Sequence, residues 1–441
     1  MRLRTLVAGS AVAIILGAAS LATHVPASAA PAAPAVAGGY HKVVPSRVLD
    51  TRDGTGAPQG KIGPDGTVSF TVLGTPGVPG TGVSAVVFNL TAVGPTGNTY
   101  ITAYPSGTQR PVVSSLNVPP GMTRANLVTV PVGADGKVTL YNNVGTVDLL
   151  ADVAGYFDTD GSAGGFLPTV PDRIFDSRDD GFPLESNSIY DFRVDYGADN
   201  DHITALALNI TSIYPQDPGF IVAWDGAGDP PLASNLNLLP GDIVPNSATV
   251  PVRLADVNND GIIDLTFALG IGSTGNVHVA MDVVGFYTDG SYESDLRYQP
   301  VTPTRVLDTR SQLGGMSRFG TAQTQSGVVP DALGTVDTAM FTGNLTVVDP
   351  TKPTYLTLWP MDAMKPPTSN VNANGGQNAA NFAYVPFDYS LYNNDGSADA
   401  VIDVAGRFQI NEPPAAAGLK SSTTSRLDSA ISRQGTAVSR R

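Results

Sequence analysis

Short apolar segments alternate with polar turns along most of the chain. Between residues 43 and 157 this pattern predicts eight strands, near 43–51, 68–73, 85–93, 100–104, 113–118, 125–132, 137–142 and 147–157. Turn-forming runs such as Pro64-Asp65-Gly66 separate them, and no helical period intervenes. Eight short strands in succession predict an antiparallel sandwich or barrel.

The same order of motifs occurs three times. The repeated segments are RVLDTR at 47–52, RIFDSR at 173–178 and RVLDTR at 305–310; Asn89, Asn209 and Asn344, each followed by an aliphatic residue and Thr; Asn126, Asn246 and Asn381; and Asp152, Asp282 and Asp403, each opening a D-V-x-G segment. The period is domain-sized and too long for a solenoid. We therefore expect an all-β protein of three tandem antiparallel β-sandwich (jelly-roll-like) domains, at 40–160, 161–290 and 291–410.

The two ends of the chain differ from the repeats. Residues 1–29 have the form of a secretory signal peptide, with Arg2 and Arg4, an apolar run and an Ala27-Ser28-Ala29 cleavage site. A linker is expected at 30–39, and a disordered basic tail at 411–441. No later stretch is apolar enough to span a membrane, so we expect a secreted protein, extracellular or associated with the cell surface, without membrane insertion.

Composition narrows the possible functions. The formal net charge is −14, and 48 Gly with 35 Pro argue against a mainly helical fold. An acidic chain without a basic stripe argues against nucleic-acid binding. With no cysteine, disulfides and thiol catalysis are excluded.

The P-x-R-V-L-D-T-R and D-V-x-G-Y-F segments resemble a tandem repeat of secreted actinobacterial-type proteins. In that family the repeat is usually an accessory module of exported cell-wall hydrolases and proteases, without known catalysis. The resemblance covers about residues 40–410 and implies an extracellular role, but it supplies no reaction or ligand. Repeat 2 departs from it at Ile174-Phe175-Asp176-Ser177, and repeat 3 ends in Gly406-Arg407-Phe408.

The repeated charged residues suit structure better than catalysis. Arg47 and Arg52 flank Asp50, and Asp152, Asn89, Asn117 and Asn126 are expected to join them in a polar network. A polar ligand site in each repeat is the alternative. The histidines after the signal do not recur between repeats, so we expect no enzyme and no catalytic residues. A hydrolase using Asp50 and Asp152 is the less favoured alternative, because nearby arginines would lower their pKa values.

Aromatic pairs recur four residues apart on one predicted strand of each repeat. They are Tyr100 and Tyr104, Phe220 and Trp224, and Tyr355 and Trp359. Alternation places both members of a pair on one face, with aliphatic residues on the other. If that face points outward, these rings are candidate ligand residues that stack on sugars and each tryptophan exposes a ring face; burial on both faces is the alternative.

One loop in repeat 2 has the spacing of a calcium site. Asp256, Asn258, Asp260, Ile262 (through its carbonyl) and Asp264 supply oxygens at intervals that suit calcium, and Gly261 permits a sharp turn. The loop resembles the Asp-rich hairpin loops of extracellular calcium modules, and we predict one calcium ion there. A plain acidic turn is the alternative.

Together these features predict a secreted, non-catalytic extracellular protein. It would bind cell-wall or other polysaccharide, or form part of the cell-surface matrix. A structural spacer or homotypic assembly protein is the alternative, and the sequence gives no oligomeric state.

Overall fold

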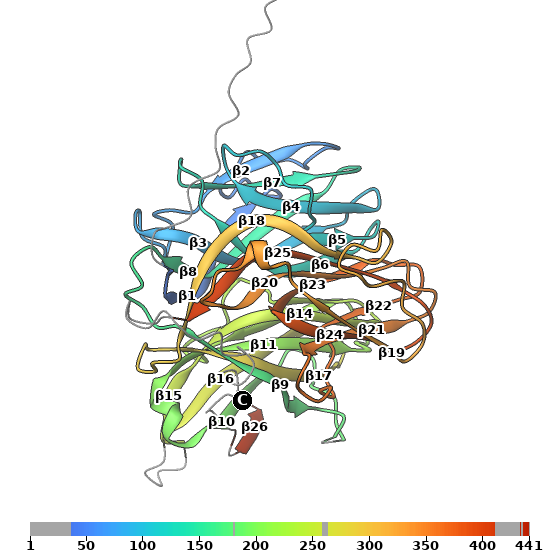
Figure 1. Ribbon diagram of the computed structural model, residues 1–441. Coiled ribbons are helices and arrows are strands. Elements are labelled where there is room, and N and C mark those ends of the chain that lie inside the picture. Colours follow the sequence, from blue (N-terminus) through green and yellow to red (C-terminus); the bar gives the residue numbers. More distant parts are fainter. Residues whose placement is uncertain (1–36, 180, 258–262, 411–432, 434, 441) are drawn as a thin grey trace, which may run out of the picture.

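The computed structural model describes residues 37–440 except 180, 258–262, 411–432 and 434. Its described part is almost entirely β-structure, with two short 3-10 helices at Gly197–His202 and Asp331–Leu333. The all-β expectation is confirmed. In Figure 1 the first repeat is blue to teal, the second green to yellow and the third orange to red.

Repeat 1 is a sandwich of two four-stranded antiparallel sheets. Its strands are β1 (Tyr40–Asp50), β2 (Thr67–Thr71), β3 (Val83–Val93), β4 (Thr99–Pro105), β5 (Leu116–Val118), β6 (Thr123–Pro131), β7 (Lys137–Asn142) and β8 (Asp148–Asp158). One sheet has the order β1-β8-β3-β6 and the other β2-β7-β4-β5. This is the strand order of a jelly roll, in which two Greek keys wrap around one core.

Repeat 2 follows the same order with two additions. Its strands are β9 (Phe166–Asp176), β10 (Ile189–Asp195), β11 (Ile203–Ile213), β12 (Gly219–Trp224), β13 (Leu236–Leu238), β14 (Ile243–Pro251), β15 (Arg253–Ala255), β16 (Asp264–Ser273) and β17 (His278–Thr288). They form the orders β9-β17-β11-β14 and β10-β16-β12-β13. The short β15 pairs with β16, and β26 (Gly435–Arg440) adds to the free edge of β10.

Repeat 3 repeats the order again. Its strands are β18 (Leu296–Asp308), β19 (Gln323–Val328), β20 (Thr338–Val348), β21 (Thr354–Pro360), β22 (Val371–Ala373), β23 (Ala379–Pro386), β24 (Asp388–Asn393) and β25 (Asp399–Ile410). One bridge between Leu296 and Phe166 joins β18 to β9. The first sheets of repeats 2 and 3 thereby form one continuous eight-stranded sheet.

Each repeat has a private core, and all three share a further one. The private cores lie between the two sheets of each sandwich, because alternate side chains of both sheets point inward. The shared core contains aromatic and small residues from all three repeats, among them Tyr40, Phe157, Phe166, Tyr298 and Phe408. The three repeats therefore pack against one another and are not independent domains joined only by linkers.

The C-terminal segment for which disorder is predicted includes a strand. Residues 435–440 form β26, antiparallel to β10 and in register from Tyr190 opposite Arg440 to Asp195 opposite Gly435. Composition suggested disorder, but an open sheet edge offers a short segment a full set of backbone partners. The expectation for residues 1–29 lies outside the described residues.

Candidate functional sites

A buried ion-pair cluster lies where β1 meets β8. Arg47 and Asp152 are register partners, and the guanidinium donates two bonds to the carboxylate, at 2.8 Å from Nε and 3.0 Å from Nη2. Arg47 Nη1 also donates to Asp50 at 3.0 Å. Arg52 donates two hydrogen bonds to the same Asp50, from Nε at 2.9 Å and from Nη2 at 2.7 Å. Both carboxylates are almost fully buried, so the cluster is held tightly in one arrangement.

The cluster is reproduced in the other repeats. The equivalent pairs are Arg173 with Asp282 and Asp176, Arg178 with Asp176, Arg305 with Asp403 and Asp308, and Arg310 with Asp308. The predicted network of repeated Arg and Asp residues is confirmed in all three copies.

The two carboxylates of each cluster have opposite pKa shifts, so the expectation that the arginines lower both pKa values is wrong for Asp152, whose pKa burial raises. Burial raises the pKa of Asp282 to about 6, although Arg173 opposes the shift. Burial also acts to raise the pKa of Asp176, but hydrogen bonds from Arg178 and the charges of both arginines outweigh it and hold that pKa below its usual value. Both oxygens of each carboxylate accept hydrogen bonds from guanidinium groups.

The repeated asparagines join the repeats in a ring. Asn126 of repeat 1 donates to Asn344 of repeat 3 at 2.9 Å, and both amides are buried. The same bond runs from Asn246 of repeat 2 to Asn89 of repeat 1 and from Asn381 of repeat 3 to Asn209 of repeat 2, each at 2.8 Å. The predicted network therefore extends between repeats, a feature that sequence alone did not reveal.

Backbone contacts close the same ring. The oxygens of Asn246, Asn381 and Asn126 accept the backbone N–H groups of Leu127, Ser247 and Phe382 at 3.1, 3.0 and 2.8 Å. In every case the N–H group belongs to the same neighbouring repeat to which that asparagine donates. Because buried amides are costly unless their bonds are made, these contacts fix how the repeats are seated. Asn117 instead accepts a local bond from Ser114.

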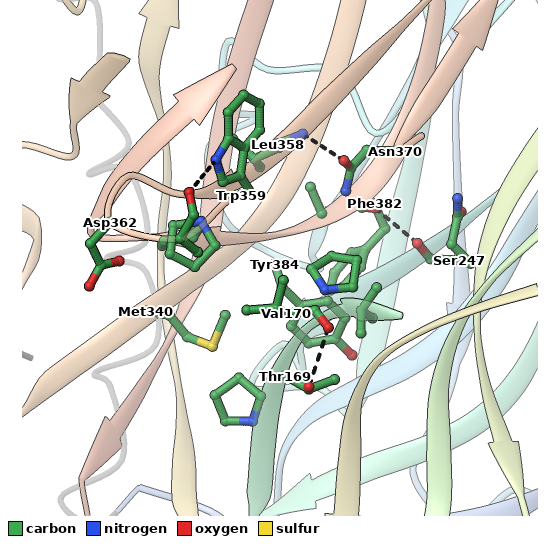
Figure 2. Close-up of a pocket in the computed structure, with 18 residues that line it drawn as sticks. Thr169, Val170, Ser247, Met340, Leu358, Trp359, Asp362, Asn370, Phe382 and Tyr384 are labelled. Atoms are coloured by element: carbon green, nitrogen blue, oxygen red, sulfur yellow. Dashed lines mark hydrogen bonds between the residues drawn. The ribbon is translucent and has the colours of Figure 1, made fainter. Parts of the chain in front are cut away.

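A cavity lies at the seam between repeats 2 and 3 (Figure 2). It has a volume of about 130 Å³ and is lined by Val170, Met340, Trp359, Phe382 and Tyr384, among others. Most of its polar side chains already bond to protein. Asn370 accepts the N–H of Leu358 and Ser247 donates to the carbonyl of Phe382. Few polar groups are left to orient a ligand, so the cavity is a weak candidate site.

We call the second sheet of each repeat, which contains β4, β12 or β21, its outer sheet. The aromatic pairs lie on the face of the outer sheet that points away from the private core, as the outward interpretation requires. The intervening side chains, such as Ile221 and Leu356, are in the private cores. The expectation that each tryptophan exposes a ring face is wrong. Trp224 is 2% exposed and Trp359 5% exposed. Trp224 packs in a small apolar cluster with Val222, Ala268 and Ile189, and Trp359 donates to the carbonyl of Ala363, in the segment after its strand, at 3.1 Å.

Tyr104 is buried like the tryptophans, whereas the first members of the pairs remain accessible. Tyr100 and Tyr355 are partly exposed, and Phe220 is 42% exposed. The two tyrosines have partners that the sequence pattern did not reveal. Tyr100 lies 6.2 Å from Tyr141, and Tyr355 lies 6.2 Å from Tyr392, between ring centroids.

A cationic side chain lies over the ring of each of these partner tyrosines, Tyr141 and Tyr392. The guanidinium of Arg110 lies 3.8 Å above the ring of Tyr141, and the ammonium of Lys365 lies 4.4 Å above that of Tyr392. We call these groups the tyrosine platforms: Tyr100, Tyr141 and Arg110 in repeat 1; Tyr355, Tyr392 and Lys365 in repeat 3. Arg110 and Lys365 stand at equal distance after Pro105 and Pro360, a spacing from which the pair could have been found.

Repeat 2 has no equivalent platform among its described residues. The position equivalent to Tyr141 and Tyr392 is Gly270, which pairs with Val222 as the two tyrosines pair with Thr102 and Thr357. Pro230 occupies the place of the cation. The platforms are thus a property of repeats 1 and 3.

The predicted calcium loop is only partly described. Asn258, Asp260 and Ile262 lie outside the described residues. The expected hairpin is present, because Ala255 pairs with Asp264 across β15 and β16. Asp264 is buried and lies 3.5 Å from a guanidinium nitrogen of Arg193. Within the described residues no three His, Cys, Asp or Glu side chains gather as a metal site.

Comparisons with known proteins do not assign the chain to a family. No family model matches it, and no curated protein matches it. Among solved structures, a chain from the atomic structure of Sulfolobus Turreted Icosahedral Virus is 8% identical, with 80% of this chain and 86% of that chain covered. Its TM-score is 0.17, so the likeness supports no argument. Across the described parts of the chain, no helix has the length and apolar character needed to cross a bilayer.

Proposed function

We propose that this chain is a secreted, non-catalytic protein that binds polysaccharide at the cell surface through its two tyrosine platforms. The observation that carries the proposal is their occurrence at equivalent places on two repeats. A partly exposed tyrosine ring offers an apolar face and a polar edge, the combination that suits a sugar ring. The neighbouring cation adds hydrogen-bond donors beside that face.

Two platforms on one rigid molecule favour a polymeric ligand. A polysaccharide offers the same unit many times, so binding at one platform raises the effective concentration of sugar at the other. The net charge of −14 disfavours acidic polymers and favours neutral ones. Each single platform is small, so we expect weak binding to short oligosaccharides and stronger binding to long ones.

The arrangement of the repeated carboxylates supports a non-catalytic role. Asp50 and Asp152, the pair considered for a hydrolase, both bind Arg47. A general acid must reach the leaving group of its substrate, whereas these carboxylates are buried between strands. Peptidoglycan, chitin, starch and casein should therefore not be hydrolysed above background.

The test is binding of the mature protein to purified cell walls and to neutral and acidic polysaccharides. The double variant Tyr100→Ala/Tyr355→Ala should lose most of the binding, about ten-fold or more, and each single variant should lose less. Phe220→Ala is the matched control, since it removes the equivalent ring from repeat 2. Unchanged binding by the double variant, or equal losses in the control, would overturn the assignment to the platforms.

A homotypic assembly protein is the second candidate. The observation that favours it is β26, the strand that the C-terminal segment adds to the outer sheet of repeat 2.

A further inference from the structure

The C-terminal strand occupies one particular sheet edge. β26 lies beside β10 at the end of the outer sheet of repeat 2 (Figure 1). Strands β2 and β19 end the equivalent sheets of repeats 1 and 3, and each has a single neighbour among the described strands. Backbone pairing alone would suit any of these edges, so the choice of β10 needs a cause in the side chains.

Charge at the two ends of the strand supplies that cause. Arg440 pairs with Glu185, and Arg433 Nε lies 3.1 Å from a carboxylate oxygen of Asp172. Val438 packs against the core of repeat 2 between them. The positions equivalent to Glu185 and Asp172 are Gly63 and Ser46 in repeat 1, and Gly320 and Thr304 in repeat 3. Repeat 2 alone offers a carboxylate at both ends of the added strand.

The strand is held weakly enough to leave. Most of its side chains are exposed or half-buried, and its ion pairs are exposed, a class that contributes little stability. Residues 411–434 connect it to Ile410, and this length of chain can extend to ~80 Å. A short peripheral strand of this kind opens without unfolding the rest of the molecule.

We propose that the edge of β10 is a strand-acceptor site that takes the C-terminal segment of a second copy of this chain. The contacts are those that the segment makes with its own repeat 2. At low concentration the tethered segment fills its own site, since a tether of this kind gives an effective concentration near the millimolar range. Where copies are crowded together, exchange links one copy to the next. The tail and the edge that it pairs with are different surfaces, so exchange that passes from copy to copy builds open chains, and reciprocal exchange between two copies gives a closed dimer.

The first experiment measures the site with a peptide of residues 433–441. Its acceptor is the full chain carrying Ala437→Pro and Val438→Pro, which cannot pair its own tail. The peptide should bind one site, and Glu185→Gln with Asp172→Asn should weaken binding about three- to ten-fold. A peptide with the same two prolines should not bind. Absence of peptide binding, or binding indifferent to the acidic residues, would overturn the acceptor site.

A transplant gives a gain-of-function control. Gly63→Glu with Ser46→Asp places the two carboxylates on repeat 1, and a side chain on Gly63 meets nothing within 4 Å. The stoichiometry of peptide binding should rise from one to two. A stoichiometry that stays at one would show that charge does not select the edge.

The second experiment tests exchange between copies. A donor with Asp172→Arg and Glu185→Arg keeps its tail but repels it, and the proline double variant keeps its acceptor edge. Each should be monomeric alone by light scattering, and an equimolar mixture at high concentration should form a 1:1 complex. If the mixture stays monomeric at millimolar concentration while the peptide binds, exchange between copies is refuted and the segment serves only its own chain.

Discussion

At the scale of single residues, the repeated asparagines make specific hydrogen bonds between repeats. Asn246 donates to Asn89 and to the carbonyl of Asn235, and it accepts the N–H of Leu127. Removal of this side chain leaves the side-chain oxygen of Asn89, the carbonyl of Asn235 and the N–H of Leu127 without this partner. A buried polar group without a partner lowers stability more than the loss of an exposed hydrogen bond does.

Asn246→Ala should therefore lower the free energy of unfolding by roughly 2–4 kcal/mol. The matched control is Asn117→Ala, whose side chain is half-buried and bonds within its own loop; it should cost less than ~1 kcal/mol. Urea denaturation measures both. Equal costs would show that the contact between repeats adds nothing.

The carboxylates make stability depend on pH in two directions. The pKa of Asp282 in the folded protein is about 6, above its ordinary value, so the native state takes up a proton before the unfolded state does. Unfolding free energy should rise as pH falls from 7.5 to about 4.5, by roughly 1–3 kcal/mol from this group.

Below that range the sign reverses. The pKa values of Asp50, Asp176 and Asp308 are lowered in the folded protein. For Asp50 and Asp176, burial acts to raise the pKa, but the hydrogen bonds and charges of the arginines together outweigh it. For Asp308, the hydrogen bond from Arg310 is the largest single cause. Their contribution is present above about pH 4 and is lost as pH falls further. Denaturation midpoints from pH 7.5 to 2.5 should pass through a maximum. A monotonic fall from neutral pH would contradict the raised pKa of Asp282.

At the scale of elements, the strands were predictable and the partners of the strands were not. All eight strands of repeat 1 lie where alternation and turn residues place them, because both signals are local. The pairing of Tyr100 with Tyr141, the packing of Trp224 with Ala268, and β26 all depend on contacts distant in sequence. The repeated Arg and Asp residues were identifiable because triplication marks them.

The predicted calcium site lies in the loop between β15 and β16, whose strands pair at Ala255 and Asp264. Addition of millimolar calcium should raise the unfolding free energy by about 0.5–1.5 kcal/mol, and chelator should reverse the change. Asp260→Ala should abolish the response, whereas Asp362→Asn, a change of the same charge on an exposed residue of repeat 3, should leave it intact. A thermal melt that does not move between chelator and excess calcium would reduce the loop to an acidic turn.

At the scale of the whole molecule, the shared core makes the repeats interdependent. Tyr40, Phe157 and Leu127 of repeat 1 are buried only because repeats 2 and 3 cover that face. An isolated repeat would expose this apolar surface together with its half of the asparagine contacts.

Residues 40–160 expressed alone should therefore self-associate or fail to fold, whereas the intact chain should melt in one cooperative transition. Light scattering on the fragment and calorimetry on the chain measure these outcomes. A fragment carrying Tyr40→Ser, Leu127→Ser and Phe157→Ser is the matched control, and it should associate less. A wild-type fragment that is monomeric and as stable as the intact chain would contradict the shared core.

The direction of the bonds between asparagine side chains also makes the contacts of the three repeats a closed circle. In the three bonds between asparagine side chains, each repeat donates to one neighbour and accepts from the other, and the first donates to the third as the third donates to the second. An open array such as a solenoid grows by adding units at its ends, but this circle has no end at which to add one. A fourth copy would find each of these asparagines already bonded to a neighbouring repeat, so it could not join the circle through the same contacts.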